Sequence, residues 1–179
     1  HPCENYELPV TPIPKISLKK KDMIIMVGYP GSGKSTFVEN NIVPIGYNRI
    51  NMDTLKTKKK CLDMCTSLIT SGKSVVIDNT NLDRKSRKEY IDIAKKYKYT
   101  IRVIYVGLSD IIMCHHFTHC RAYKSYINKR IESNSVPMVA FYKSRKIFEY
   151  PDQKTEGFDE LIVLPHNMPM DSDHMLYYF

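Results

Sequence analysis

Short apolar runs alternate with longer amphipathic segments along most of the chain. The strong runs lie at residues 23–27, 74–77, 101–106 and 161–164, and a weaker one lies at 49–51. Their nearly continuous Val, Ile, Leu and Met content is typical of parallel strands that are buried on both faces. The pattern therefore predicts an α/β fold, in which a parallel sheet of four or five strands is flanked by helices.

The segments between the runs are predicted to be helical, and residues with capping or stopping preferences set their limits. Asp83 and Ser109 are typical N-caps, Ser135 shortly precedes a proline that suits a first helical turn, and Gly72 is a typical helix stop. With these caps included, the predicted helices cover residues 34–41, 54–71, 83–97, 109–124 and 135–150. This alternation of strands and helices is characteristic of a wound sheet.

Changes in composition set the predicted domain limits. Residues 1–22 hold prolines at positions 2, 9, 12 and 14 and a run of lysines near their end, so they predict a linker or packed arm. Residues 23–165 are predicted to form one domain, and residues 166–179 a C-terminal tail. The apolar runs are too short for a membrane span, and the start of the chain does not resemble a signal peptide.

The charge balance adds information about partners. The 179 residues carry 27 Lys and Arg against 19 Asp and Glu, which gives a formal net charge of +8. Such an excess favours an anionic partner such as nucleic acid, nucleotide or membrane headgroups, although it also serves solubility alone. Basic residues gather at 56–60, 84–88, 121–130 and 143–146, where they could follow a polyanionic strand. The five cysteines form no regular framework, which indicates reduced thiols in an intracellular compartment.

A glycine-rich segment follows the first strong run and opens the first predicted helix. It matches the pattern G-x-x-x-x-G-K-[ST] at every specified position, and with the next residue it reads Gly28-Tyr29-Pro30-Gly31-Ser32-Gly33-Lys34-Ser35-Thr36. Glycines let backbone N–H groups converge on phosphate oxygens, and the positive end of the following helix reinforces this binding. We therefore expect the segment to bind ATP, with Lys34 reaching the β- and γ-phosphates and the Ser35 hydroxyl binding Mg²⁺.

A carboxylate follows each of two other apolar runs. Asp53 comes after the run at 49–51 and Asp78 after the run at 74–77, at the strand ends where such sheets bind ligands. A kinase needs one group that accepts the proton of the acceptor hydroxyl and another that holds or orders the metal. We expect Asp53 to do the first and Asp78 the second. The alternatives are that Asp53 caps the helix that follows it and that Asp78 forms a turn.

These residues belong to longer phrases that resemble the 5′-kinase domain of the polynucleotide kinase/3′-phosphatase family. The resemblance extends over about residues 23–164, and its selective part is an Asn-x-Asp-Thr-Leu phrase at 51–55 combined with an Asp-Asn-Thr-Asn phrase at 78–81. Further similar phrases are Ser-Arg-Lys-Ile-Phe-Glu at 144–149 and Glu-Gly-Phe at 156–158. The phosphate loop alone is shared with many other enzymes.

The resemblance implies a fold, an activity and several residue roles. It implies a P-loop kinase fold with a mobile helical lid, here residues 109–135, and transfer of the γ-phosphate of ATP to the 5′-hydroxyl end of DNA or RNA in end repair. It makes Asp53 the general base, and it places Arg121 on the lid helix beside the transferring phosphate. A guanidinium suits that place because it can engage two phosphate oxygens at once. In a eukaryotic source it implies a nuclear location.

Three features depart from the family pattern. Met52 precedes the base aspartate where the family usually has arginine, and His119 stands at a lid position where arginine is expected. The phosphatase motif Asp-x-Asp-x-Thr is absent from the sequence, since the Asp-x-Asp at 171–173 is followed by His-Met. Because the chain begins with His1, we expect a phosphatase domain to precede these residues in a longer parent chain.

Other functions compete with this interpretation. A P-loop kinase of a small metabolite such as gluconate or shikimate would share the phosphate loop, but the net charge of +8 and the paired phrases favour a polynucleotide. An ATP-dependent binding module or motor would bind ATP without transferring phosphate to a strand. The Cys- and His-rich stretch at 114–120 invites a zinc site, but its members fall on different helix faces, which favours a His-rich lid helix.

Overall fold

The computed structural model describes residues 14–107, 110–129 and 136–164, and within them a parallel sheet confirms the predicted α/β class. Five strands lie in the order β2-β3-β1-β4-β5, and every neighbouring pair is parallel. Each predicted run forms a strand, with ends that differ by at most one residue from the prediction. The strands are β1 (Asp22–Val27), β2 (Asn48–Ile50), β3 (Val75–Ile77), β4 (Thr100–Val106) and β5 (Glu160–Leu164).

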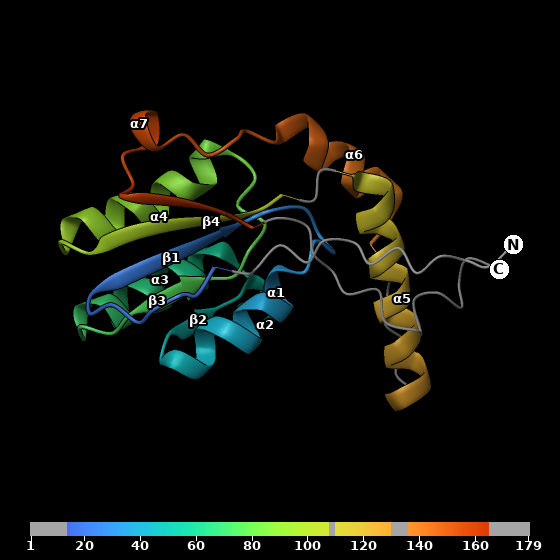
Figure 1. Ribbon diagram of the computed structural model, residues 1–179, viewed down its shortest axis with the longest axis horizontal. Helices are drawn as coiled ribbons and strands as arrows, with labels where there is room; N and C mark the ends of the chain where they lie inside the picture. Colours follow the sequence, from blue (N-terminus) through green and yellow to red (C-terminus); the bar gives the residue numbers. More distant parts are fainter. Residues whose placement is uncertain (1–13, 108–109, 130–135, 165–179) are drawn as a thin grey trace, which may run out of the picture.

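The central strand β1 is buried on both faces, as its unbroken apolar sequence predicts. Met23, Ile25 and Val27 face one hydrophobic core, while Ile24 and Met26 face the other. Helices α3 (Lys58–Thr70) and α4 (Arg84–Lys96) cover the first face. The segment that follows the phosphate loop covers the second face. The molecule therefore has helical layers on both sides of one sheet (Figure 1).

The helix predicted at 34–41 is shorter in its α-helical part than expected. Helix α1 (Lys34–Phe37) continues into a π-helical turn, η1 (Val38–Ile42), and a 3₁₀ turn, η2 (Val43–Ile45). Pro44 lies inside the last turn and has no N–H for a helical hydrogen bond, so a regular helix does not continue there. Gly46, with φ 110°, ends the segment.

The single helix predicted at 54–71 is wrong, because the structure has two helices there. Helix α2 (Met52–Leu55) ends at Lys56, whose φ of 69° is left-handed, and α3 starts anew two residues later. The Thr57 hydroxyl accepts a hydrogen bond from the Lys60 N–H at 3.3 Å and caps α3. The alternative role of Asp53 as a helix cap is also wrong. The cap of α2 is Asn51, and Asp53 is the second residue inside that helix.

The remaining helices follow the prediction with shifted ends. Asp83 caps α4 as expected. Helix α5 (Ile111–Lys129) runs about one turn further than predicted, and α6 (Met138–Ile147) ends three residues earlier. A short helix, α7 (Gln153–Glu156), was not predicted. The predicted starts Ser109 and Ser135, and the tail at 166–179, lie outside the described residues. Asp110 accepts hydrogen bonds from the first turn of α5.

Helices α5 and α6 form a unit beyond the carboxyl edge of the sheet, where a lid is expected (Figure 1). A third hydrophobic cluster joins them to the phosphate loop through Tyr29, Cys114, Phe117 and Phe141. Phe148 leaves the helical conformation and its ring lies 5.5 Å from that of Tyr29, which accounts for the early end of α6. In the part of the chain that the structure describes, no helix is both long and apolar enough to cross a bilayer.

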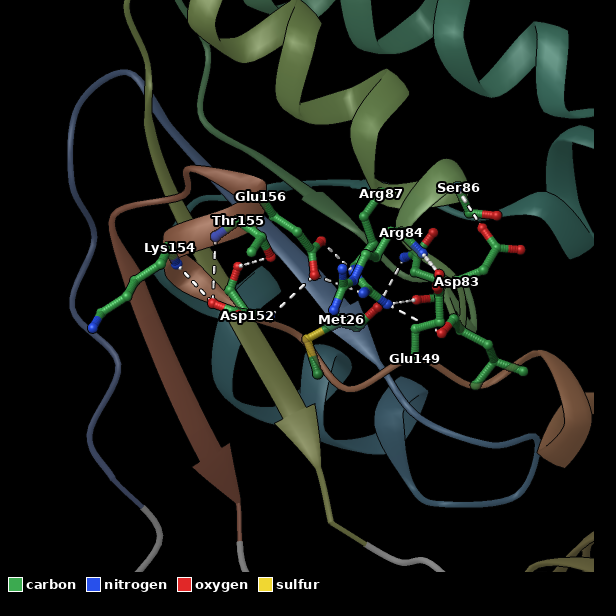
Figure 2. Close-up of polar contacts among 12 residues, drawn as sticks. Met26, Asp83, Arg84, Ser86, Arg87, Glu149, Asp152, Lys154, Thr155 and Glu156 are labelled. Atoms are coloured by element: carbon green, nitrogen blue, oxygen red, sulfur yellow. Dashed lines mark hydrogen bonds and ion pairs between the residues drawn. The ribbon is translucent and has the colours of Figure 1, made fainter.

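A buried ion pair fixes the loop after β3 against the C-terminal part of the domain (Figure 2). The guanidinium of Arg87, which is fully buried, donates from Nε and Nη2 to the two carboxylate oxygens of Glu156, each at 2.7 Å. Its Nη1 donates to the carbonyl oxygens of Asn81 at 2.9 Å and Leu82 at 3.1 Å. The pair thus links α4, α7 and the Asp-Asn-Thr-Asn segment. It gives Glu156 of the Glu-Gly-Phe phrase a structural role.

Candidate active site

The phosphate loop has the backbone conformation that its glycines predict. Gly31 and Gly33 have φ values of 74° and 90°, a region that residues with side chains rarely adopt. A Cβ atom on Gly31 would collide with the carbonyl oxygen of Cys114 and the methyl group of Thr118, both in α5. The loop therefore needs glycine at this position for two reasons: the backbone conformation of the loop itself and the close approach of α5.

Lys34 lies at the centre of the loop with its side chain buried. Its ammonium group donates to the Tyr29 carbonyl oxygen at 2.6 Å and to Ser32 Oγ at 3.3 Å. Burial lowers the pKa of Lys34 to about 8, against the opposing pull of Asp78 and, more weakly, Asp53. Arg121 adds to the lowering of this pKa. The four charged residues predicted for the site thus lie within electrostatic reach of one another.

Asp78 follows β3 directly and is almost fully buried. Its Oδ1 accepts a hydrogen bond from Ser35 Oγ at 3.3 Å, so the two predicted metal ligands are neighbours. A hydroxyl oxygen and a carboxylate oxygen at this separation are ligand atoms that suit the compact octahedral coordination of Mg²⁺. The other carboxylate oxygen accepts from Arg49 Nε at 2.8 Å and Nη2 at 2.6 Å. Arg49 was missed in the sequence because nothing local to it points to Asp78.

Asp53 is exposed at the same edge of the sheet. Its backbone N–H donates to Asn51 Oδ1 at 2.7 Å, whereas its carboxylate makes no hydrogen bond or ion pair within the described residues. Ile50 and Ile77 are register partners in β2 and β3, so the residues that follow them emerge side by side. Asp53 and Asp78 therefore follow strands that end at the same edge of the sheet.

Arg121 lies on α5 and is exposed. On the same helix, His115 and His119 face each other, with their Nε2 atoms 3.0 Å apart. His116 Nε2 lies 3.3 Å from Cys120 Sγ on the adjacent part of the helix. Across the described ranges, no group of three or more Cys, His, Asp or Glu side chains is placed to hold a metal ion. The histidine-rich stretch lies on α5, the same helix that holds Arg121.

Strand, glycine loop, buried lysine and helix together define a P-loop nucleotide-binding protein. More particularly, the chain belongs to the family described as AAA domain, whose model matches residues 23–117. A solved gluconokinase from Sinorhizobium meliloti 1021 shares the fold, with a TM-score of 0.55, 15% identity, and coverage of 88% of this chain and 90% of that one. At this identity the likeness concerns the fold alone.

Two relatives carry the comparison further. A putative bifunctional polynucleotide phosphatase/kinase of Acanthamoeba polyphaga mimivirus is 43% identical over 151 residues, which cover 82% of this chain and 34% of the relative. The bifunctional polynucleotide phosphatase/kinase of Schizosaccharomyces pombe is 37% identical over 145 residues, covering 81% and 34%. The chain spans about a third of the length of these relatives. The resemblance read from the sequence phrases is confirmed.

Proposed function

We propose that this chain is the ATP-dependent 5′-hydroxyl kinase part of a polynucleotide phosphatase/kinase. The observation that carries the proposal is the grouping of Lys34, Asp78, Asp53 and Arg121 at one edge of the sheet around a phosphate loop. This grouping supplies a phosphate site, a metal-ligand pair, a free carboxylate and a guanidinium, which are the parts that phosphoryl transfer requires. The names of the relatives supply the class of acceptor.

Each residue has one task in the proposed reaction. The N–H groups of the phosphate loop and Lys34 bind the β- and γ-phosphates of ATP. Asp53 takes the proton of the 5′-hydroxyl while the hydroxyl oxygen forms a bond to the γ-phosphorus. The bond between the γ-phosphorus and the oxygen that bridges it to the β-phosphate breaks, and ADP leaves. Arg121 stabilises the charge on the transferring group. Ser35 and Asp78 would hold Mg²⁺, which neutralises phosphate charge when bound.

The proposal extends to the parent protein. The relatives are named bifunctional, and this chain aligns with about a third of each. We therefore expect a 3′-phosphatase elsewhere in the parent chain, a role in the repair of nucleic-acid ends, and a nuclear location in a eukaryotic source.

A transfer assay tests the proposal directly. The chain is incubated with γ-labelled ATP and Mg²⁺ and either a 5′-hydroxyl oligonucleotide, the same oligonucleotide with a 5′-phosphate, or gluconate. We expect label only on the 5′-hydroxyl oligonucleotide. Label on gluconate would favour a metabolite kinase instead, and ATP binding without transfer to any acceptor would favour a binding module.

Strand binding is expected to depend strongly on salt, because the net charge is +8 and a basic run at 56–60 directly follows helix α2. We expect the Kd of a 5′-hydroxyl oligonucleotide, measured by fluorescence anisotropy, to rise about tenfold or more between 50 and 200 mM KCl. Lys60→Gln, at the start of α3 on the site side, should weaken the salt dependence. Lys73→Gln, before β3 at the opposite edge, is the matched control and should leave it unchanged. A Kd that does not respond to salt would contradict a polyanionic substrate.

ATP affinity is expected to fall at alkaline pH. Burial lowers the pKa of Lys34 to about 8, and bound phosphates raise this pKa by favouring the charged form. Below pH 8 the lysine is already charged and binding takes up no proton. Above pH 8 most of the Lys34 side chains are neutral and must take up a proton when ATP binds. At pH 9 we therefore expect ATP to bind about tenfold more weakly than at pH 7. Isothermal calorimetry in buffers of different ionisation enthalpy measures this proton uptake, and AMP, which lacks the β- and γ-phosphates, should show none.

A further inference from the structure

Helix α2, which carries Asp53, does not hold its own position. It has only four residues, and a single turn of helix is unstable without outside support. Its first three N–H groups all bind side chains from outside the helix. Asn51 Oδ1 accepts from Asp53 at 2.7 Å and from Thr54 at 3.3 Å, and Asn79 Oδ1 accepts from Met52 at 2.8 Å.

Both asparagines connect α2 to the end of β3. Asn79 is the residue after Asp78, so it moves with the carboxylate of the metal-ligand pair. Its Nδ2 lies 3.4 Å from the hydroxyl of Tyr90 in α4, which leaves Oδ1 to face the Met52 N–H. Asn51 Nδ2 donates to the Asp78 carbonyl oxygen at 3.0 Å. Helix α2 is therefore fixed at two points to the segment that also carries Asp78.

The carboxylate of Asp53 depends on this support. Among the described residues it has no hydrogen-bond or ion-pair partner of its own, so its place in the site comes only from the position of the α2 backbone. Proton transfer in a phosphoryl-transfer step is sensitive to displacements of about 1 Å in the reacting groups. A residue that fixes the first turn of α2 therefore controls the rate without touching the substrate.

We propose that Asn79 is a positioning residue for the transfer step, which acts through its hydrogen bond to the Met52 N–H on the place of Asp53. This inference rests on the proposed function, in which Asp53 accepts the proton of the 5′-hydroxyl. It gives the second residue of the Asp-Asn-Thr-Asn phrase a task distinct from that of Asp78. Asp78 serves the metal side of the site, and Asn79 serves the acceptor side.

Two substitutions at this position separate the hydrogen bond from the shape of the side chain. Asn79→Ala removes the acceptor, and we expect kcat for a 5′-hydroxyl oligonucleotide to fall by about 10- to 100-fold with the Kd of ATP unchanged. Asn79→Asp keeps an acceptor for the Met52 N–H, and we expect it to recover kcat to within about fivefold of the parent. Asn48→Ala is the matched control. Asn48 is also a half-buried asparagine, it lies at the far end of β2, and its Nδ2 donates to a backbone oxygen. Asn48→Ala should keep the parental kcat.

A double-mutant cycle with Asp53→Asn tests whether Asn79 acts through Asp53. In the Asp53→Asn background, Asn79→Ala should cost almost nothing further, because there is no base left to misplace. An undiminished cost in that background, or a parental kcat for Asn79→Ala itself, would overturn the inference. Should Asn79→Ala not fold by circular dichroism, Asn79→Ser replaces it, because its shorter side chain falls short of Met52.

The cycle also separates this inference from the proposed function. If Asp53→Asn impairs transfer and Asn79→Ala does not, only the positioning role is lost. If Asp53→Asn transfers phosphate at the parental rate, the base assignment of the proposed function fails first, and the positioning role fails with it.

Discussion

Lys34→Met is expected to reduce phosphate transfer by about 10³-fold or more while the protein remains folded. The methionine keeps the length of the side chain inside the loop but removes the charge that binds the β- and γ-phosphates. Burial lowers the pKa of Lys34 to about 8, which means that the folded protein holds this charge at a disadvantage. Removing it should therefore leave the melting temperature equal to that of the parent or higher. Single-turnover transfer to a 5′-hydroxyl oligonucleotide measures the first effect, and thermal unfolding the second.

The control for this experiment is a lysine outside the site. Lys20 is exposed and lies before β1 at the opposite edge of the sheet, so Lys20→Met removes the same charge from the same kind of side chain. It should transfer phosphate at the parental rate. Transfer by Lys34→Met within about threefold of the parent would exclude a central role for the phosphate loop in the reaction. A large loss in both variants would indicate an effect of net charge alone.

The parts of the site that are local in sequence could be predicted, since a local pattern determines them. The phosphate loop needs glycines at fixed spacing between a strand and a helix, and Gly31 and Gly33 adopt the left-handed conformation that this spacing implies. The strands were predictable because strands buried on both faces require continuous apolar residues, as β1 shows. The alignment of β2 and β3 then brings Asp53 and Asp78 to one edge.

The supports of the site could not be predicted, because they join segments far apart in sequence. Arg49 binds Asp78 across 29 positions, and Asn79 binds Met52 across 27. The break between α2 and α3 was missed for a related reason. Thr57 is as acceptable inside a helix as at its start, and Lys56 takes a left-handed conformation that ends α2, which Asn51 and Asn79 bind at its first turn. Helix propensity does not determine where α2 ends and α3 begins, and contacts between distant segments do.

Asp53→Asn is expected to lower the rate of phosphate transfer by about 10² to 10⁴-fold, with the Kd of ATP and the melting temperature close to those of the parent. The 5′-hydroxyl has a pKa far above neutral, so the transfer benefits from a carboxylate that accepts its proton as the bond to phosphorus forms. Asparagine has the same shape but cannot accept that proton. Because the carboxylate of Asp53 makes no hydrogen bond within the described residues, the substitution removes no native contact.

The structure also predicts how substitutions at Asp53 and Asn51 change the free energy of unfolding. Asn51, and not Asp53, caps α2, so Asp53→Ala should leave the free energy of unfolding almost unchanged and reduce transfer as much as Asp53→Asn. Asn51→Ala should instead cost about 1 kcal/mol in the free energy of unfolding, because it leaves the N–H groups of Asp53 and Thr54 without their acceptor. Rapid-quench kinetics and urea titration of the three variants measure the two effects separately. Transfer at the parental rate by a folded Asp53→Asn protein would rule out Asp53 as the base. Equal destabilisation by Asp53→Ala and Asn51→Ala would show that Asp53 has a structural role at the start of α2.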